Sequence, residues 1–214
     1  PRAHHVIELA VERIVAGRVE ASYQQLVTPP DTLPPVVQSL TRITPAMLEG
    51  KPRIASVATS FLECIGGNAL LVGQNLDFDL QMLKGDGIDL IGRPWIDTSL
   101  LASLAFPELP STSLPFLSVL LSLPHDPPHR AMGDVHATAA LLDRIIERFT
   151  ALPQDRYEEL RSVLRRTTEG YRLFADALPV RSNGTWGGSM RLTPPDRTAD
   201  DHSLDWVVPR PLAG

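Results

Sequence analysis

Hydrophobic and polar positions alternate near the start of the chain, with the period of two that is typical of a half-buried β-strand. Residues 6–15 and 19–23 both show this alternation, and Ala16-Gly17 lies between them, which predicts a hairpin of two half-buried strands. Residues 69–72 form an unbroken apolar run, which is typical of a strand buried on both faces in the middle of a sheet. Residues 94–96 predict one more short strand.

Elsewhere apolar residues recur at intervals of three and four, which predicts α-helices. Thr44-Pro45 has the form of an N-cap followed by proline at the first helical position, and Gly50 ends that short helix. The longest predicted helix covers residues 133–149. Further helices are expected at 54–65, from 76, after Asp97, and at 113–121, 157–164 and 169–178. Strands that alternate with helices favour an α/β fold with a mixed sheet.

The helical periodicity fades beyond Pro179, where the sequence becomes rich in proline and glycine. We expect a main domain over residues 1–150, a helical extension over 151–178 and a linker or tail over 179–214. Such a tail packs poorly unless a partner holds it.

Composition narrows the class of protein. The chain has 214 residues, a net charge of −5 and one cysteine, Cys64, so an internal disulfide is excluded and a cytoplasmic location is expected. No apolar run reaches the length of about 18 residues that a membrane helix needs. The negative charge lies within residues 1–150, which argues against sequence-tolerant coating of nucleic acid through phosphate contacts. The charge does not exclude a small site in which metal ions, rather than lysines, contact the phosphate.

Two carboxylates follow the predicted buried strand, in Gln74-Asn75-Leu76-Asp77-Phe78-Asp79. Sites in open α/β sheets gather beyond the carboxyl ends of such strands, and carboxylate oxygens suit a hard cation. The alternative interpretation is structural, because aspartates at a helix start cap free amides and complement the helix dipole.

His129 and Asp134 form a second candidate pair. With an ordinary pKa of about 6.5, a histidine can accept a proton from water at neutral pH. Asp134 opens the longest predicted helix, and Pro127-Pro128 restrict the loop before His129. The alternative is an N-cap aspartate with an unrelated loop histidine. Asp97 is expected to be a helix cap and His136 to be a surface or packing residue, whereas no partner pattern marks His4, His5, His125 or His202.

Five short motifs, in chain order, resemble the DnaQ-like 3′→5′ exonucleases. This family has an RNase H-like fold and includes the epsilon subunit of DNA polymerase III and the exonuclease module of DinG-type helicases. The motifs are residues 6–10, Leu-Thr-Arg-Ile-Thr at 40–44, Leu-Val-Gly-Gln-Asn-Leu-Asp-Phe-Asp at 71–79, Asp97-Thr98, and His-Arg-Ala-Met-Gly-Asp at 129–134. The residues that follow, 152–178, resemble the helices behind the exonuclease module of DinG-type helicases.

The resemblance implies roles for individual residues. Asp79 and Asp134 would be metal ligands and His129 the general base, whereas Asp77 falls on a variable position. The complete site would hold two Mg²⁺ or Mn²⁺ ions that clamp the terminal phosphodiester. The expected partners are a DNA 3′ end, single-stranded or frayed, and a polymerase or a fused helicase domain. Supporting or substrate-contacting roles would fall to Asn75, Thr44 and Asp97.

One departure from the family is large. The family's Asp-x-Glu-Thr motif lies on a strand that precedes residues 6–10, and no acidic residue precedes Val6 here. The resemblance places that strand centrally, between the hairpin and residues 69–72. We therefore expect that this chain is truncated from a longer parent that carries the first strand, and that activity is crippled in this chain by the absence of that motif. Together with Arg42 and Gln74, which replace a glycine and a common histidine, this departure also favours an alternative: a degenerate, non-catalytic module that binds nucleic acid or a replication partner.

Overall fold

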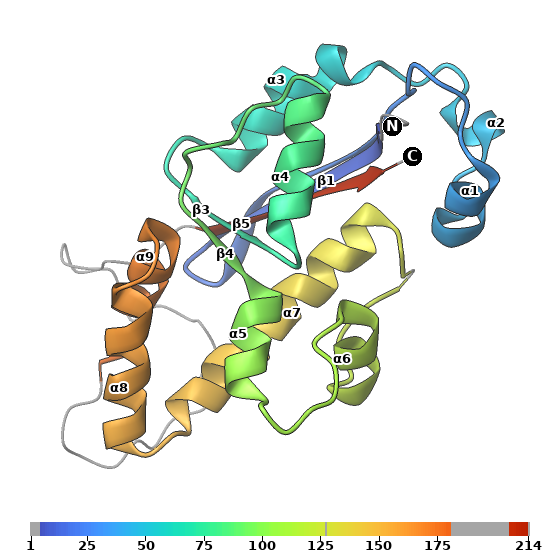
Figure 1. Cartoon of the computed structure of the whole chain (residues 1–214). Helices are drawn as coiled ribbons and strands as arrows, with labels where there is room; N and C mark the ends of the chain where they lie inside the picture. The colour runs from blue at the N-terminus through green and yellow to red at the C-terminus, as the bar shows by residue number, and fades with distance from the viewer. Residues whose placement is uncertain (1–4, 127, 181–205, 214) are drawn as a thin grey trace.

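A mixed five-stranded β-sheet with helices on both faces forms the centre of the protein, seen in a computed structural model (Figure 1). The structure describes residues 5–126, 128–180 and, for the backbone, 206–213. The strands are β1 (Val6–Val15), β2 (Arg18–Leu26), β3 (Leu70–Gly73), β4 (Trp95–Asp97) and β5 (Trp206–Ala213). Their order is β2-β1-β5-β3-β4, with β5 antiparallel to β1 and parallel to β3. The predicted α/β class with a mixed sheet is confirmed.

The described helices follow the predicted positions closely, apart from the first. They are α1 (Pro35–Thr41), α2 (Pro45–Leu48), α3 (Ile54–Ile65), α4 (Leu76–Gly85), α5 (Thr98–Ala105), α6 (Leu114–Leu120), α7 (Ala131–Thr150), α8 (Gln154–Arg165) and α9 (Glu169–Ala177). None of them is both long and apolar enough to cross a membrane. The predicted N-cap of α2 is confirmed, because the Thr44 side chain accepts from the Met47 amide. Helix α1 was not predicted, since prolines surround it.

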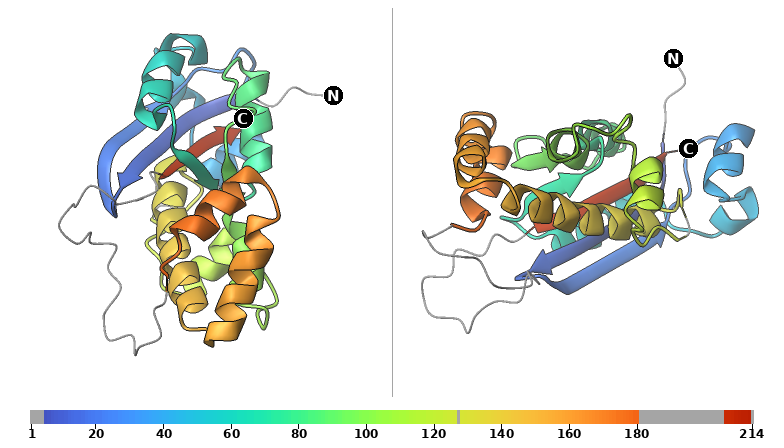
Figure 2. Two further views of the ribbon diagram at one scale, coloured as in Figure 1. Left: turned by 90° about the vertical axis from the view of Figure 1, so that its left-hand side faces the viewer. Right: turned by 90° about the horizontal axis from the view of Figure 1, so that it is seen from below.

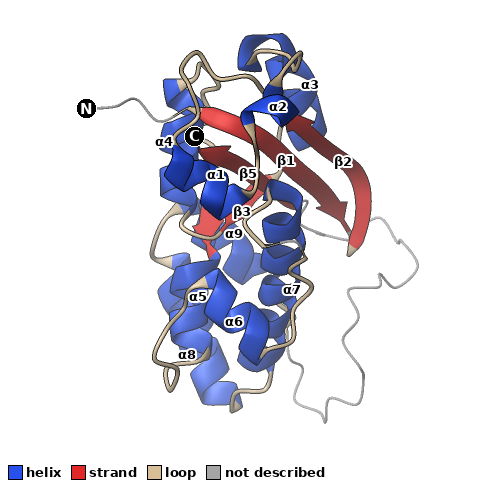
Figure 3. Ribbon diagram, turned by 90° about the vertical axis from the view of Figure 1, so that its right-hand side faces the viewer, coloured by secondary structure: helices blue, strands red, loops and turns tan. Residues whose placement is uncertain are grey.

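The β1–β2 hairpin was predicted, but β1 is more deeply buried than expected. Strand β2 lies at the edge of the sheet (Figure 3). It is half exposed, whereas nearly every residue of β1 is buried, Glu8 and Glu12 included. The reason is that β1 has a strand on each side, β2 and β5, and is covered by α3 and α7. A strand enclosed in this way has no solvent face for its polar residues.

The central position of the sheet is filled by the far end of the chain. We expected the strand between β1 and β3 to be missing, yet residues 206–213 occupy that position as β5. The prediction of a linker or tail over 179–214 was therefore wrong for these eight residues, whereas 181–205 and 214 lie outside the described residues. Pro209 and Pro211 argue against a central strand in the sequence. The pairing with β3 reaches only Trp206 and Val207, so both prolines lie beyond it.

Two hydrophobic clusters lie on the two faces of the sheet. One face of β1 and β3 packs with α5, α6 and α7, and the same cluster extends to α8 and α9. The other face packs with α3 and α4. Figure 2 shows the layers from two directions, with α7 running along the sheet. The alternation of the strand side chains between the two clusters follows from the two-residue period of a strand.

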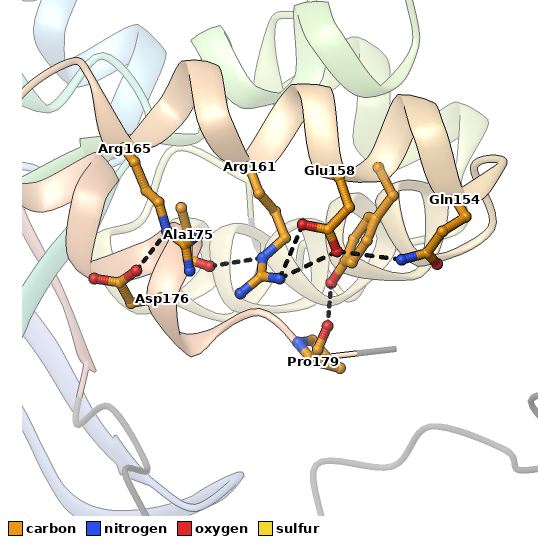
Figure 4. Close-up of polar contacts among 8 residues, drawn as sticks. Gln154, Glu158, Arg161, Arg165, Ala175, Asp176 and Pro179 are labelled. Atoms are coloured by element: carbon orange, nitrogen blue, oxygen red, sulfur yellow. Dashed lines mark hydrogen bonds and ion pairs between the residues drawn. The ribbon is translucent and has the colours of Figure 1, made fainter. Parts of the chain in front are cut away.

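The α8–α9 pair, which was predicted as a helical extension, packs on the same core as α5 and α7. Arg161 is only 4% exposed, and its guanidinium donates to the Ala175 carbonyl at 3.2 Å and to Glu158 at 3.3 Å (Figure 4). The Tyr157 hydroxyl donates to the Pro179 carbonyl at 2.7 Å. These bonds satisfy the buried polar groups between the two helices. Whether residues 1–150 form a domain of their own stays a prediction.

Gly170 lets α9 lie directly on β4. A Cβ at this position would collide with the backbone of Trp95. Gly170→Ala should therefore lower the free energy of unfolding by about 3 kcal/mol, measured by urea denaturation. Gly85→Ala is the matched control, because a Cβ there meets no heavy atom within 4 Å, and it should be neutral or slightly stabilising. Equal stabilities of the two variants would contradict this account of the α9–β4 contact.

A buried ion pair joins β1 to the start of α7. The Arg130 guanidinium donates to the Glu8 carboxylate at 2.7 and 3.0 Å, and the Ala131 amide and Gln24 donate to it as well. Burial by itself raises the pKa of Glu8, but these hydrogen bonds outweigh it, so the pKa lies below its ordinary value of 4.5. The pair thus fixes the first turn of the helix that carries Asp134.

Because the folded-state pKa of Glu8 is lowered, its ionised form stabilises the fold at neutral pH, and this contribution is lost as the pH falls through the folded pKa. Glu8→Gln should cost about 3 kcal/mol at pH 7, since it leaves Arg130 without its charged partner. Urea unfolding at several pH values should show the difference from wild type shrinking below pH 4.5. Glu20→Gln is the control, because its ion pair with Arg13 is exposed and should contribute under about 0.5 kcal/mol. A cost for Glu8→Gln that does not vary with pH would contradict the assignment.

Candidate active site

Asp79 lies in the first turn of α4, directly after the buried strand β3. Its side chain is 2% exposed. The chain turns from strand to helix within two residues: Gly73 leaves no room for a Cβ against the Leu76 side chain, and Asn75 has a left-handed φ of 56°. Asparagine tolerates this conformation better than most residues. The turn places Asp79 at the carboxyl end of β3, as predicted.

Asp97 ties this turn to the next one. One carboxylate oxygen accepts from the Asn75 amide at 3.2 Å and from the Ser99 amide at 2.8 Å, and the other accepts from the Leu76 amide at 3.3 Å. The Asp97 amide donates to the Tyr171 hydroxyl at 3.1 Å. The expected role of Asp97 as a helix cap is confirmed, and the same carboxylate also holds the start of α4.

Gln74 is a buried connection rather than a surface residue. Its side-chain nitrogen donates to the Thr112 carbonyl at 2.6 Å, and its oxygen accepts from the Thr98 hydroxyl at 2.6 Å. The amide group therefore joins the β3–α4 turn to α5 and to the segment before α6. This gives a structural reason for glutamine where the family often has histidine. The other departure, Arg42, has φ 58° and ends α1, a left-handed position that favours glycine.

Asp134 lies in the first turn of α7 and is 4% exposed. Its carboxylate contacts the ring of His125, with Nε2 and Oδ1 2.7 Å apart, and the His125 side chain is 7% exposed. Sequence reasoning missed His125. It lies in a proline-rich loop, where neither spacing nor periodicity connects it to Asp134.

His129 lies in the loop before α7, half buried, with a left-handed φ of 60°. No hydrogen bond joins its ring to another of the described residues. Its role as a base therefore stays a prediction. His136 was expected to be a surface or packing residue. It lies in the second turn of α7, and its ring contacts Glu12 at 3.2 Å where α7 packs on β1.

The two helices that carry the predicted acidic residues contact the same strand. Helix α4 with Asp79 and helix α7 with Asp134 both contact β5. Carboxylate oxygens are suitable ligands for Mg²⁺ or Mn²⁺. Among residues 5–126 and 128–180, however, no three Asp, Glu, His or Cys side chains gather around one possible ion position. The described residues therefore do not assemble a two-ion site by themselves, and the roles of Asp79 and Asp134 as metal ligands stay predictions.

Comparisons with known proteins agree with this architecture. Residues 1–142 match the RNase T family, described as exonuclease. A Mycobacterium tuberculosis protein provisionally named a bifunctional exonuclease/endonuclease is 31% identical over 186 residues, which are 82% of this chain and 28% of that protein. The 3′-5′ exonuclease DinG of Bacillus subtilis is 29% identical over 73% of this chain and 17% of its own length. This chain thus spans less than a third of either relative.

Two shorter proteins match over most of their own length. The DNA polymerase III subunit epsilon of Aquifex aeolicus is 32% identical over 146 residues, which are 66% of this chain and 72% of that protein. The solved structure of exonuclease X in complex with 5′ overhanging duplex DNA superposes with a TM-score of 0.57 at 25% identity, over 75% of this chain and 93% of that one. Fold, motifs and sequence agree, and the chain belongs to the RNase T/DnaQ-like family of 3′→5′ exonucleases.

Proposed function

We propose that this chain is the body of a hydrolase that removes nucleotides from the 3′ end of DNA. The observation that carries the proposal is the position of two buried carboxylates, Asp79 and Asp134, at the starts of two helices that both contact β5. His129 lies two residues before the start of α7, the helix that carries Asp134. Membership of an exonuclease family and a fold shared with a DNA-bound exonuclease support the substrate class.

Each candidate residue has one task in this proposal. Asp79 and Asp134 offer oxygens to Mg²⁺ or Mn²⁺, and His129 accepts the proton of the attacking water. Two bound metal ions would neutralise charge at the phosphate and would supply an activated water. Further carboxylates from outside the described residues are needed to complete such a pair. The β3–α4 turn with Asn75 and the cap of α2 with Thr44 would shape the substrate side of the site, while Asp97 holds the turn in place.

A second candidate function is supported by the sequence of β5. The strand that both acid-bearing helices contact contains no aspartate or glutamate. A chain in this state would bind a DNA end, or a replication partner, without cutting it. The two candidate functions predict different results when carboxylates are introduced on β5. The first predicts that the DNA is then cut, and the second predicts that it is only bound.

Pro209 and Pro211 are the positions at which to test this, because both lie on the strand that α4 and α7 contact and they pair in register with Val11 and Leu9 of β1. The variant Pro209→Asp/Pro211→Glu should bind Mn²⁺ in calorimetry and shorten a 5′-labelled single strand from its 3′ end. Its rate should be at least tenfold above that of Pro209→Asn/Pro211→Gln, which matches it in shape but not in charge. Adding Asp134→Asn or His129→Ala to the acidic variant should abolish cleavage.

Cleavage that persists in the acidic variant with Asp134→Asn would contradict the assignment of Asp134 to the active site. If the acidic variant binds no Mn²⁺ and cuts no faster than the neutral one, while both bind the DNA strand equally, the non-catalytic function is the correct one. Circular dichroism of both variants checks that the fold is retained.

A further inference from the structure

The central position of the sheet is filled by an extended segment that is distant in sequence from both of its neighbours. Strand β5 inserts between β1 and β3, although nearly the whole chain lies between β1 and β5. It pairs with β1 from Ile14↔Trp206 to Val6↔Ala213. With β3 it pairs only at Leu70↔Trp206 and Leu71↔Val207. The site thus has one long antiparallel edge and one short parallel edge.

The walls of this site are apolar and closed. Leu70, Leu71 and Val72 of β3 are at most 1% exposed, and β1 is buried almost throughout. Helices α4 and α7 cover the position from the two faces. If β5 left, unpaired backbone groups of both neighbours would face an apolar space, which costs free energy for each group. The position therefore favours any extended segment that can fill it.

The present occupant fills the position incompletely. Pro209 and Pro211 have no backbone N–H, so two of the eight residues of β5 cannot donate to a neighbouring strand. Val72 and Gly73 pair with β4, but their pairing with β5 is absent from the described register. A register shift between Val6 and Glu8 interrupts the other edge as well. A strand without prolines would make more of these bonds.

From these observations we propose that the position between β1 and β3 is an exchangeable strand-binding site. Its ligand is an extended segment of about eight residues, antiparallel to β1 and parallel to β3, and residues 206–213 are its own intramolecular occupant. The same segment of a second copy can enter the site in place of the first. This inference concerns the sheet and does not depend on the proposed catalytic function.

The test begins with the whole folded chain. A protease recognition sequence is inserted between Gly187 and Gly188, and the purified protein is cut there after folding. The cut segment should stay bound during gel filtration. A tenfold excess of a labelled peptide of residues 204–214 should then replace it in most molecules, whereas a peptide of the same composition in scrambled order should not bind.

Two peptides test the proline argument. A peptide with Pro209→Val and Pro211→Val should leave the cut protein at least tenfold more slowly than the natural sequence, because it restores two donors. Hydrogen exchange gives an independent measurement on the folded protein that has been cut between Gly187 and Gly188. The amides of β1 and β3 should exchange at least tenfold faster there than in the uncut chain, and an excess of the natural peptide should restore their protection.

Several outcomes would overturn the proposal. The cut segment could dissociate while the amides of β1 and β3 keep their protection, which would mean that β5 does not fill the site. The labelled peptide could fail to enter over several days, which would mean that the strand is not exchangeable. Equal residence times of the two peptides would remove the role of the prolines. None of these results bears on cleavage of DNA, so the proposed function is tested separately.

Discussion

The pairing of β5 with β1 and β3 is the interaction on which the remaining structure depends. Both neighbours are buried on their two faces, so the backbone groups along their facing edges have no water to bind. Buried amides and carbonyls of this kind are almost always paired, since an orphaned group costs about 1–3 kcal/mol. Helices α4 and α7, which carry Asp79 and Asp134, rest on the same strand. The positions of both candidate acids are thus linked to the strand that fills the centre of the sheet.

The polar side chains around this centre act mainly as joints between elements. Asp97 holds two helix starts with one carboxylate, and the Gln74 amide connects three segments. Glu8 and Arg130 join β1 to α7. Such charge-assisted bonds are stronger than neutral ones and give a rigid frame. Asp79 and Asp134 lie inside that frame, which is what a site needs if it is to hold its ligands in a fixed geometry.

Local patterns in the sequence were sufficient for most elements. The apolar run at 69–72, the caps Thr44 and Asp97, and the helical spacing of 133–149 each depend on a few neighbouring residues, and the structure confirms them. Strand β5 could not be predicted, because two prolines oppose a central strand and only distant partners favour it. The contact of His125 with Asp134 joins a loop to a helix and leaves no periodic pattern. The roles of Asp79, Asp134 and His129 come from the family resemblance, and they stay predictions.

The pairing of Val6 with Ala213 brings the start of β1 and the end of β5 side by side. The start of β1 and the end of β5 are therefore neighbours in space although they are distant in sequence. If residue 214 were joined to residue 1 and the chain opened within 181–205, β5 and β1 would become a local hairpin with every strand pairing unchanged. In the present order that pairing closes a loop of almost the full chain, and such non-local contacts slow folding. During synthesis, β1 and β3 emerge long before their common partner, so the sheet stays incomplete until residues 206–213 have been made.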